Sequence, residues 1–213
     1  MFSGDLWEVA VIDVDRPSVS DRFLGYEPTM SPDGHYISFI KFFPPHAAEN
    51  AEDHYMLYDL IKDAAHNRPR GNSFDDWQTV GVTVYPSGIG NHDVDNLHRP
   101  QSAVHMLSSE GFFWDSSSDQ LVFADDYQGS TSVVLVDVLP DGKVTTRIAP
   151  VSADACGEKA ITSCTLRLVG VVFSRTPDLR FALTFMGTGR SIGLKRVIVF
   201  DFAQFSTLGV TGG

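Results

Sequence analysis

Short apolar runs that end in an aspartate recur four times along the chain. They span residues 9–14, 55–60, 133–138 and 197–202, and each closes with Asp followed by one apolar residue. Their β-branched and aromatic residues favour strands over helices. The closing Asp suits the start of a turn, because its carboxylate can accept hydrogen bonds from nearby backbone N–H groups.

A second element, a tight turn leading into an alternating strand, precedes the last three of these runs. The turns cover residues 30–34, 114–119 and 173–178, and the strands that follow cover 35–40, 120–124 and 179–185. Each unit is therefore strand, turn, strand, loop, strand, and segments 79–84 and 144–148 are candidates for a fourth strand. Repeated four-stranded antiparallel units are typical of propeller blades, although the varying spacing makes this repeat degenerate.

The first of these units resembles the WD40-like repeats of TolB-type β-propellers. Their pattern runs apolar-W/F-S-P-D-G-x-x-I-A-F and ends I-Y-v-x-D-l, and residues 28–39 read PTMSPDGHYISF. The unit at Trp114 lacks the Pro, and the unit at Phe173 has Leu179 at the Gly position. The resemblance covers residues 25–202 and implies an all-β fold of propeller-type blades. It does not indicate a function, because such propellers serve peptidases, binding proteins and scaffolds alike.

The number of recognisable units is small for a closed propeller, which has about four to eight blades. We treat residues 1–213 as a single all-β domain that is part of a longer protein. Two alternatives stay open: a divergent blade within residues 61–107, or self-association of copies to complete a propeller. The strand at residues 6–14 is a candidate to close the ring against the last unit, because no long strand is expected after Phe202.

The alternating positions of the strands define an expected core. Helix is expected at most in two short segments, residues 45–52 and 155–160. The predicted core residues are Ile37, Phe39, Leu57, Val122, Leu135, Phe181, Leu183, Ile198 and Phe200.

Charge and composition exclude some partners. The formal net charge is −11, from 27 acidic and 16 basic residues, which argues against binding nucleic acid. Membrane insertion is not expected, because no apolar run approaches the roughly 20 residues that span a bilayer. The protein is expected in the cytoplasm, or in the periplasm or outside the cell if a signal peptide has been removed. Cys156 and Cys164 form a disulfide in an exported protein or stay reduced in the cytoplasm.

The segment from residue 67 to residue 109 carries the best candidate for chemistry. Its Gly and Pro residues mark turns, and it holds three of the seven histidines. His92, Asp93, Asp95 and His98 are candidate ligands for a divalent metal ion, since imidazole and carboxylate groups suit zinc, manganese, iron or calcium. A regular strand would point the histidines and aspartates to opposite sides, so such a site requires an irregular loop. The alternative is a solvated polar loop.

Catalytic motifs are absent from the sequence: there is no Gly-x-Ser-x-Gly elbow and no His-Glu-x-x-His. Three functions remain open. The sequence favours a noncatalytic binding or scaffold module for a protein or small-molecule ligand. The others are an accessory propeller domain of a larger hydrolase, such as a serine peptidase, and a small metal-dependent enzyme that uses the His/Asp loop.

Overall fold

The described part of the protein is all-β. The computed structural model describes residues 8–15, 18–24, 26–41, 54–61, 82–83, 111–127, 130–152, 165–174, 180–188 and 193–211. Every pairing between strands in these segments is antiparallel, and helix is confined to residues 60–61 and a 3-10 turn, η6 (Phe202–Gln204). The expected all-β class is confirmed. The two segments expected to be helical lie outside the described residues.

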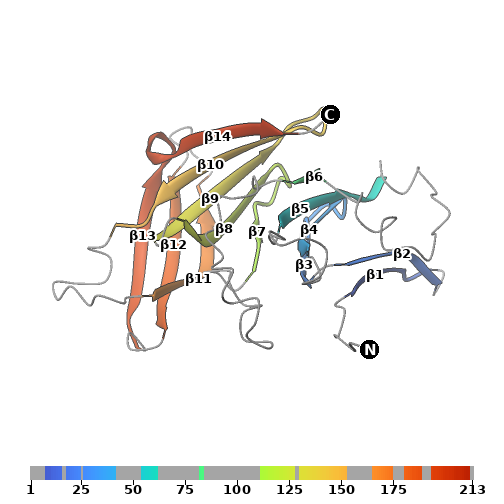
Figure 1. Ribbon diagram of the computed structural model, residues 1–213, viewed down its shortest axis with the longest axis horizontal. Helices are drawn as coiled ribbons and strands as arrows, with labels where there is room; N and C mark the ends of the chain where they lie inside the picture. Colours follow the sequence, from blue (N-terminus) through green and yellow to red (C-terminus); the bar gives the residue numbers. More distant parts are fainter. Residues whose placement is uncertain are drawn as a thin grey trace, which may run out of the picture.

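The strands form a hairpin and three larger sheets in chain order (Figure 1). The hairpin consists of β1 (Glu8–Asp13) and β2 (Ser18–Leu24). The first sheet has the order β3 (Tyr26–Met30), β4 (Tyr36–Lys41), β5 (His54–Asp59), β6 (Val82–Thr83). The second has the order β14 (Ser206–Thr211), β10 (Val144–Pro150), β9 (Ser130–Val138), β8 (Gln120–Tyr127), β7 (Phe113–Trp114). The third has the order β11 (Thr165–Phe173), β12 (Arg180–Thr188), β13 (Lys195–Asp201).

The three sheets share one register, which confirms that the sequence units are structural repeats. The second strand of each begins opposite the closing aspartate, in the pairs Tyr36–Asp59, Gln120–Asp137 and Arg180–Asp201. One position further along, the same strands pair with the preceding strand, as Ile37–Met30, Leu121–Trp114 and Phe181–Phe173. Equivalent residues can therefore be assigned by counting from these pairs.

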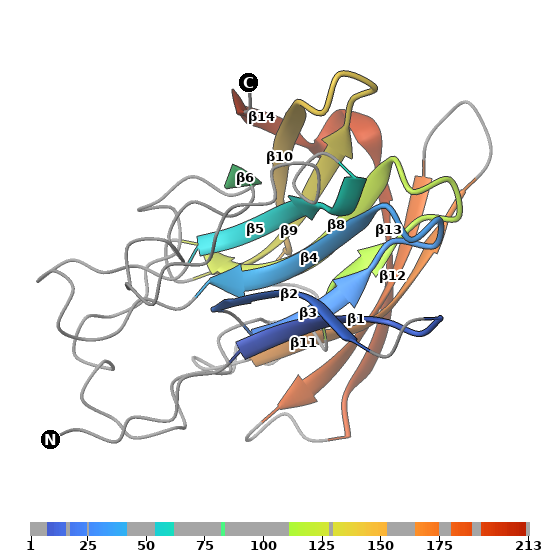
Figure 2. The same ribbon diagram turned by 90° about the vertical axis from the view of Figure 1, so that its right-hand side faces the viewer.

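The sheets stack face to face, and each interface between them is a hydrophobic cluster (Figure 2). Between the hairpin and the first sheet lie Val9, Ile37, Phe39, Met56 and Tyr58. Between the first and second sheets lie Ile40, Tyr55, Leu57, Phe112, Leu121, Phe123, Val134, Val136, Val138, Val144 and Ile148. Between the second and third lie Val122, Ala124, Val133, Leu135, Ala149, Val151, Leu166, Leu168, Phe181, Leu183, Phe185, Phe200 and Phe205. Alternate residues of one strand thus face opposite neighbours, as the pleat requires.

The predicted core is confirmed at all nine positions but one. Ile198 is only half-buried, because it lies near the end of the stack and packs against the cluster from its rim. The other eight residues are buried. The predicted fourth strands are present at β10 and, for the two described residues of 79–84, at β6.

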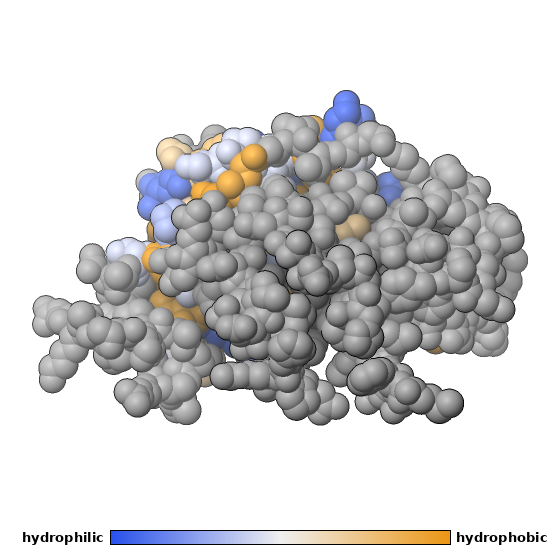
Figure 3. Space-filling view, in the orientation of Figure 1, coloured by the Kyte–Doolittle hydropathy of each residue, from blue (hydrophilic) through white to orange (hydrophobic). Residues whose placement is uncertain are grey.

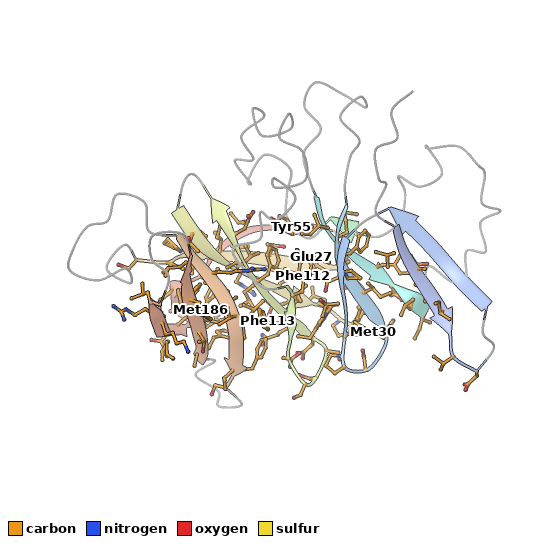
Figure 4. All side chains as sticks on the ribbon, turned by 90° about the horizontal axis from the view of Figure 1, so that it is seen from below. Glu27, Met30, Tyr55, Phe112, Phe113 and Met186 are labelled. Carbon is orange, nitrogen blue, oxygen red and sulfur yellow. The ribbon has the colours of Figure 1, made fainter. Side chains whose placement is uncertain are left out.

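Two expectations about the chain ends are wrong. β1 pairs with β2 rather than with the last sheet. A strand of six residues, β14, follows Phe202 and joins the second sheet beside β10 instead of extending the third. Phe205, which precedes β14, and Leu208 within it explain this placement. Phe205 packs between the second and third sheets, and Leu208 packs against the cluster between the first and second. The described sheets form an open row, with β1–β2 and β11–β13 at opposite ends (Figures 1 and 4).

Candidate functional site

The turn before β4 is built around the carboxylate of Asp33. Its Oδ1 accepts hydrogen bonds from Ser31 Oγ at 2.6 Å and from the backbone N–H of His35 at 3.0 Å. Ser31 Oγ in turn accepts the backbone N–H of Tyr36 at 2.9 Å. Gly34 has φ +74°, a conformation that costs a residue with a Cβ free energy. The Ser-Pro-Asp-Gly sequence therefore specifies this turn through its own side chains.

The equivalent turn before β8 uses Asp115 in place of Ser31. Asp115 Oδ1 accepts the backbone N–H groups of Asp119 and Gln120, both at 3.1 Å. Its Oδ2 accepts the Ser117 N–H at 3.1 Å and also the Ser117 hydroxyl. Ser118 occupies the Gly34 position and keeps its left-handed backbone, with φ +64°. In the shared register, Asp33 is equivalent to Ser117 and not to Asp119. The two turns therefore match in backbone shape but not in side-chain chemistry.

The two turns interlock, and we call residues 31–36 and 115–120 the turn edge. The Asp33 backbone N–H donates to Ser118 Oγ at 3.1 Å across the two sheets. Behind this bond, Trp114 Nε1 donates to Ser38 Oγ at 3.2 Å, and the Trp114 ring stacks on Tyr36 with a centroid separation of 6.1 Å. The turns lie side by side at one border of the stack (Figures 2 and 4). Hydrogen bonds and ring stacking thus hold the turn edge rigid.

The carboxylates of Asp33 and Asp115 are held in their charged form. The Ser31 hydroxyl and then the His35 N–H lower the pKa of Asp33 from its ordinary value. Burial of Asp115 opposes its ionisation, yet the hydrogen bonds from Ser117, Gln120 and Asp119 together outweigh burial, and the pKa of Asp115 is lowered as well. Asp33 and Asp119 are exposed, whereas Asp115 is buried. The turn edge therefore presents a fixed negative charge to solvent near neutral pH.

An imidazole–carboxylate pair lies at one end of the turn edge. His35 Nε2 lies 3.0 Å from Asp59 Oδ1, and that oxygen also accepts the backbone N–H of Ile61 at 2.9 Å. The nearby Ser31 hydroxyl is buried and donates to Asp33, so it is not directed at His35 as a nucleophile would be. The pair fastens the end of β5 to the start of β4. It confirms for Asp59 the predicted use of a closing Asp to accept a backbone N–H.

The closing Asp of the second sheet has different partners. Asp137 accepts Gln120 Nε2 at 3.0 Å and forms an ion pair with Arg147 on β10. The Arg147 guanidinium also lies over the Phe202 ring, 4.6 Å from its centroid, and burial lowers its pKa. These contacts tie β8, β9, β10 and η6 together, so they stabilise the sheet without creating an open site.

Glu27 in the first sheet has an unusual backbone conformation. Its φ of +52° is rare for a residue with a Cβ, and it lies where the register between β3 and β4 shifts after Tyr26. Glu27 is labelled in Figure 4, and its strand β3 is an edge strand of the first sheet. Residues with a strained backbone are often found at binding and catalytic sites. Glu27 is therefore a candidate functional residue that the sequence pattern did not reveal.

The candidate metal ligands His92, Asp93, Asp95 and His98 lie outside the described residues, as do Cys156 and Cys164. Within the residues that the structure describes, no group of three or more His, Cys, Asp or Glu side chains is placed to hold a metal ion. Asp125 and Asp126 lie within β8, opposite Ser132 and Thr131.

Comparison with protein-family models, with curated proteins and with solved structures gives no match. In the described segments, no helix has the length and apolar character needed to cross a membrane.

Proposed function

We propose that this chain is a noncatalytic binding module built from β-propeller-type blades, and that the turn edge is its ligand surface. The single observation that carries the proposal is the interlocking of the two turns, which uses Asp33 and Ser118 to join neighbouring sheets. A loop surface held rigid by its scaffold is suited to recognition, because little conformational entropy is lost on binding.

The propeller-type arrangement is supported by three sheets with one register and by their stacking in chain order. The first and second sheets each contain a four-stranded antiparallel meander, β3–β6 and β7–β10, as blades do. Three such sheets form a row rather than a ring, so the proposal concerns the type of unit and not a closed propeller.

The chemistry of the turn edge favours a protein ligand that carries Lys or Arg. Asp33 and Asp119 present carboxylates to solvent, and the lowered pKa of Asp33 keeps it ionised. Charge complementarity of this kind steers association and fixes orientation. Because Ser31 is buried and engaged with Asp33, the same edge lacks an available nucleophile beside His35.

The proposal is tested by titrating the ¹⁵N-labelled protein with a Lys/Arg-rich peptide, with a Ser/Gly peptide of equal length as the reference. We expect the amide shifts to concentrate at residues 33–35 and 117–119. The double variant Asp33→Asn, Asp119→Asn should weaken binding roughly fivefold, because each exposed carboxylate contributes about 0.5 kcal/mol. Asp141→Asn is the matched control, since Asp141 is an exposed carboxylate on the turn between β9 and β10.

Two results contradict the proposal. If the double variant loses only about twice the binding free energy that the single-charge variant Asp141→Asn loses, the peptide senses only the overall charge of −11. Turnover of model ester, peptide or phosphodiester substrates that is abolished by His35→Ala would show that His35 and Asp59 serve catalysis.

A further inference from the structure

Among the strands that the structure describes, the third sheet lacks one that the first and second sheets have. β13 occupies the place of β5 and β9, as the shared register of the closing aspartates shows. β5 pairs on its far side with β6, and β9 pairs on its far side with β10. Within the described segments β13 pairs only with β12, and the chain continues to β14 in the second sheet. The far side of β13 is thus an edge of its sheet, and we call it the β13 edge.

Solvent reaches the β13 edge even on the face that the second sheet covers. Ile198 packs against the cluster between the second and third sheets, but it is only half-buried. Its equivalents three residues before a closing Asp, Met56 and Val134, are 4% and 0% exposed. On the other face of β13, Val197 and Val199 are 68% and 56% exposed. Figure 3 shows apolar side chains at this end of the molecule, on the left. Both faces of β13 are therefore exposed as those of an edge strand are.

An edge of this kind favours pairing with another strand. It presents a row of backbone N–H and C=O groups, and its centre is the apolar run of residues 197–200. Proteins commonly protect such edges with a proline, a bulge or a charge within the strand. β13 contains no proline, its register with β12 is unbroken over seven residues, and its charged residues lie only at its ends. The β13 edge is therefore suited to accept an antiparallel strand.

The sequence of β13 is complementary to itself in one antiparallel register. When two copies pair about Ile198, Lys195 lies opposite the partner's Asp201, and this pair occurs at both ends. In the same register Val197 lies opposite the partner's Val199, and residues directly opposite share a face of the sheet. Pairing about either valine instead would leave one charged residue opposite an apolar one. Charge complementarity thus selects a second copy of β13 as the strand that fits this edge.

We propose that two copies of this chain associate edge to edge through β13, so that their third sheets form one continuous six-stranded antiparallel sheet. The contact is isologous, because the same strand serves both copies, and it therefore closes as a dimer. The inference goes beyond the ligand surface at the turn edge and does not depend on it. The turn edge belongs to the first and second sheets, whereas this contact uses the third sheet alone.

The test reverses the charges at the two ends of β13 and follows sedimentation velocity up to about 100 μM, the range of weak specific association. Lys195→Asp and Asp201→Lys each place like charges opposite one another at both ends of the paired strands. Each should weaken dimerisation about 30-fold, because two attractive cross-strand pairs become repulsive. Both residues are exposed, so circular dichroism and thermal unfolding of the dilute variants should stay close to the wild type. Lys143→Asp, at an exposed lysine of the β9–β10 turn, is the control and should dimerise as the wild type does.

We expect the wild type to sediment at twice the monomer mass and each charge-reversed variant to be a monomer at the same concentration. Mixing the two variants should restore a dimer, because the copy with two negative ends then pairs with the copy with two positive ends. The proposal is overturned if the wild type is a monomer throughout the range. It is also overturned if Lys195→Asp dimerises as tightly as the wild type, or if the mixture stays monomeric.

Amide hydrogen exchange of the wild type locates the contact. Diluting the protein from about 100 μM to about 1 μM should speed exchange in residues 195–201, because their outward N–H groups lose their acceptors in the partner. β14 is also an edge strand of its sheet and serves as the internal reference, so its exchange should not change. A concentration dependence at β14 and not at β13 would overturn the proposal.

Discussion

Val133 and Val197 occupy equivalent positions in the second and third sheets, but Val133 is buried and Val197 is exposed. The substitutions Val133→Thr and Val197→Thr therefore compare the same change at a covered and at an uncovered position. Both valines lie four residues before a closing Asp, on the same face of their sheets. Val133 lies between Ala124 and Ala149 on the neighbouring strands and faces the third sheet. Thr keeps the β-branched shape, so the strand preference changes little between the two variants.

The expected magnitudes follow from burial. At Val133, the lost methyl group removes about 0.8 kcal/mol of transfer free energy, and burying the hydroxyl costs about 1–2 kcal/mol. The free energy of unfolding should therefore fall by about 2–3 kcal/mol. For a chain of this length each kcal/mol lowers the melting temperature by about 2–4 °C. At Val197, which solvent already reaches, the change should stay within about 0.5 kcal/mol.

The assay is urea unfolding followed by circular dichroism, at the same low protein concentration for both variants. Dilution removes any contribution of a second copy to the stability of Val197→Thr. The slope of the free energy against urea should be the same for both variants, so that midpoints can be compared. Equal losses of stability in the two variants would refute the assignment of covered and uncovered faces.

Further predictions concern the turn edge. Asp115→Ala should lower the free energy of unfolding by about 2–4 kcal/mol, because the backbone N–H groups of Ser117, Asp119 and Gln120 all lose a charged acceptor. Unchanged urea midpoints would contradict this. Because the pKa of Asp115 is lowered in the folded protein, its ionised carboxylate stabilises the fold above the ordinary pKa of about 3.9, and this stability is lost as the pH falls through the folded pKa. The loss of stability in acid should therefore be smaller in Asp115→Ala than in the wild type. Gly34→Ala should cost about 1 kcal/mol through backbone strain alone, since nothing lies within 4 Å of the added Cβ, and a neutral result would argue against the left-handed turn. Trp114→Phe should cost about 1 kcal/mol through loss of the bond to Ser38, an effect that a Ser38→Ala background should remove in a double-mutant cycle.

Much of the repeat could be predicted from local pattern. The alternation of apolar residues fixes which side of a strand is buried, and the closing aspartates mark the same register position in all three sheets. The Ser-Pro-Asp-Gly motif also located the first turn of the turn edge, because Asp33 and Gly34 act within the turn itself.

What the sequence did not reveal depends on partners far apart in the chain. The pairing of β14 with β10 follows from where Phe205 and Leu208 find cover, and the short strand STLGVT does not by itself specify a partner strand. The His35–Asp59 pair joins residues 24 positions apart, and only the register shows that they meet. Aligning the units on their closing aspartates would have found it, because His35 directly precedes the residue that pairs with Asp59.

The stacking of the sheets in chain order is the central structural claim, and methyl–methyl nuclear Overhauser spectroscopy tests it most directly. The account predicts cross-peaks from Leu57 to the methyl groups of Val134 or Val136, and from Leu135 to Leu183, because these residues share the clusters between neighbouring sheets. Cross-peaks between Leu57 and Leu183 would place the first and third sheets in contact and contradict the stack.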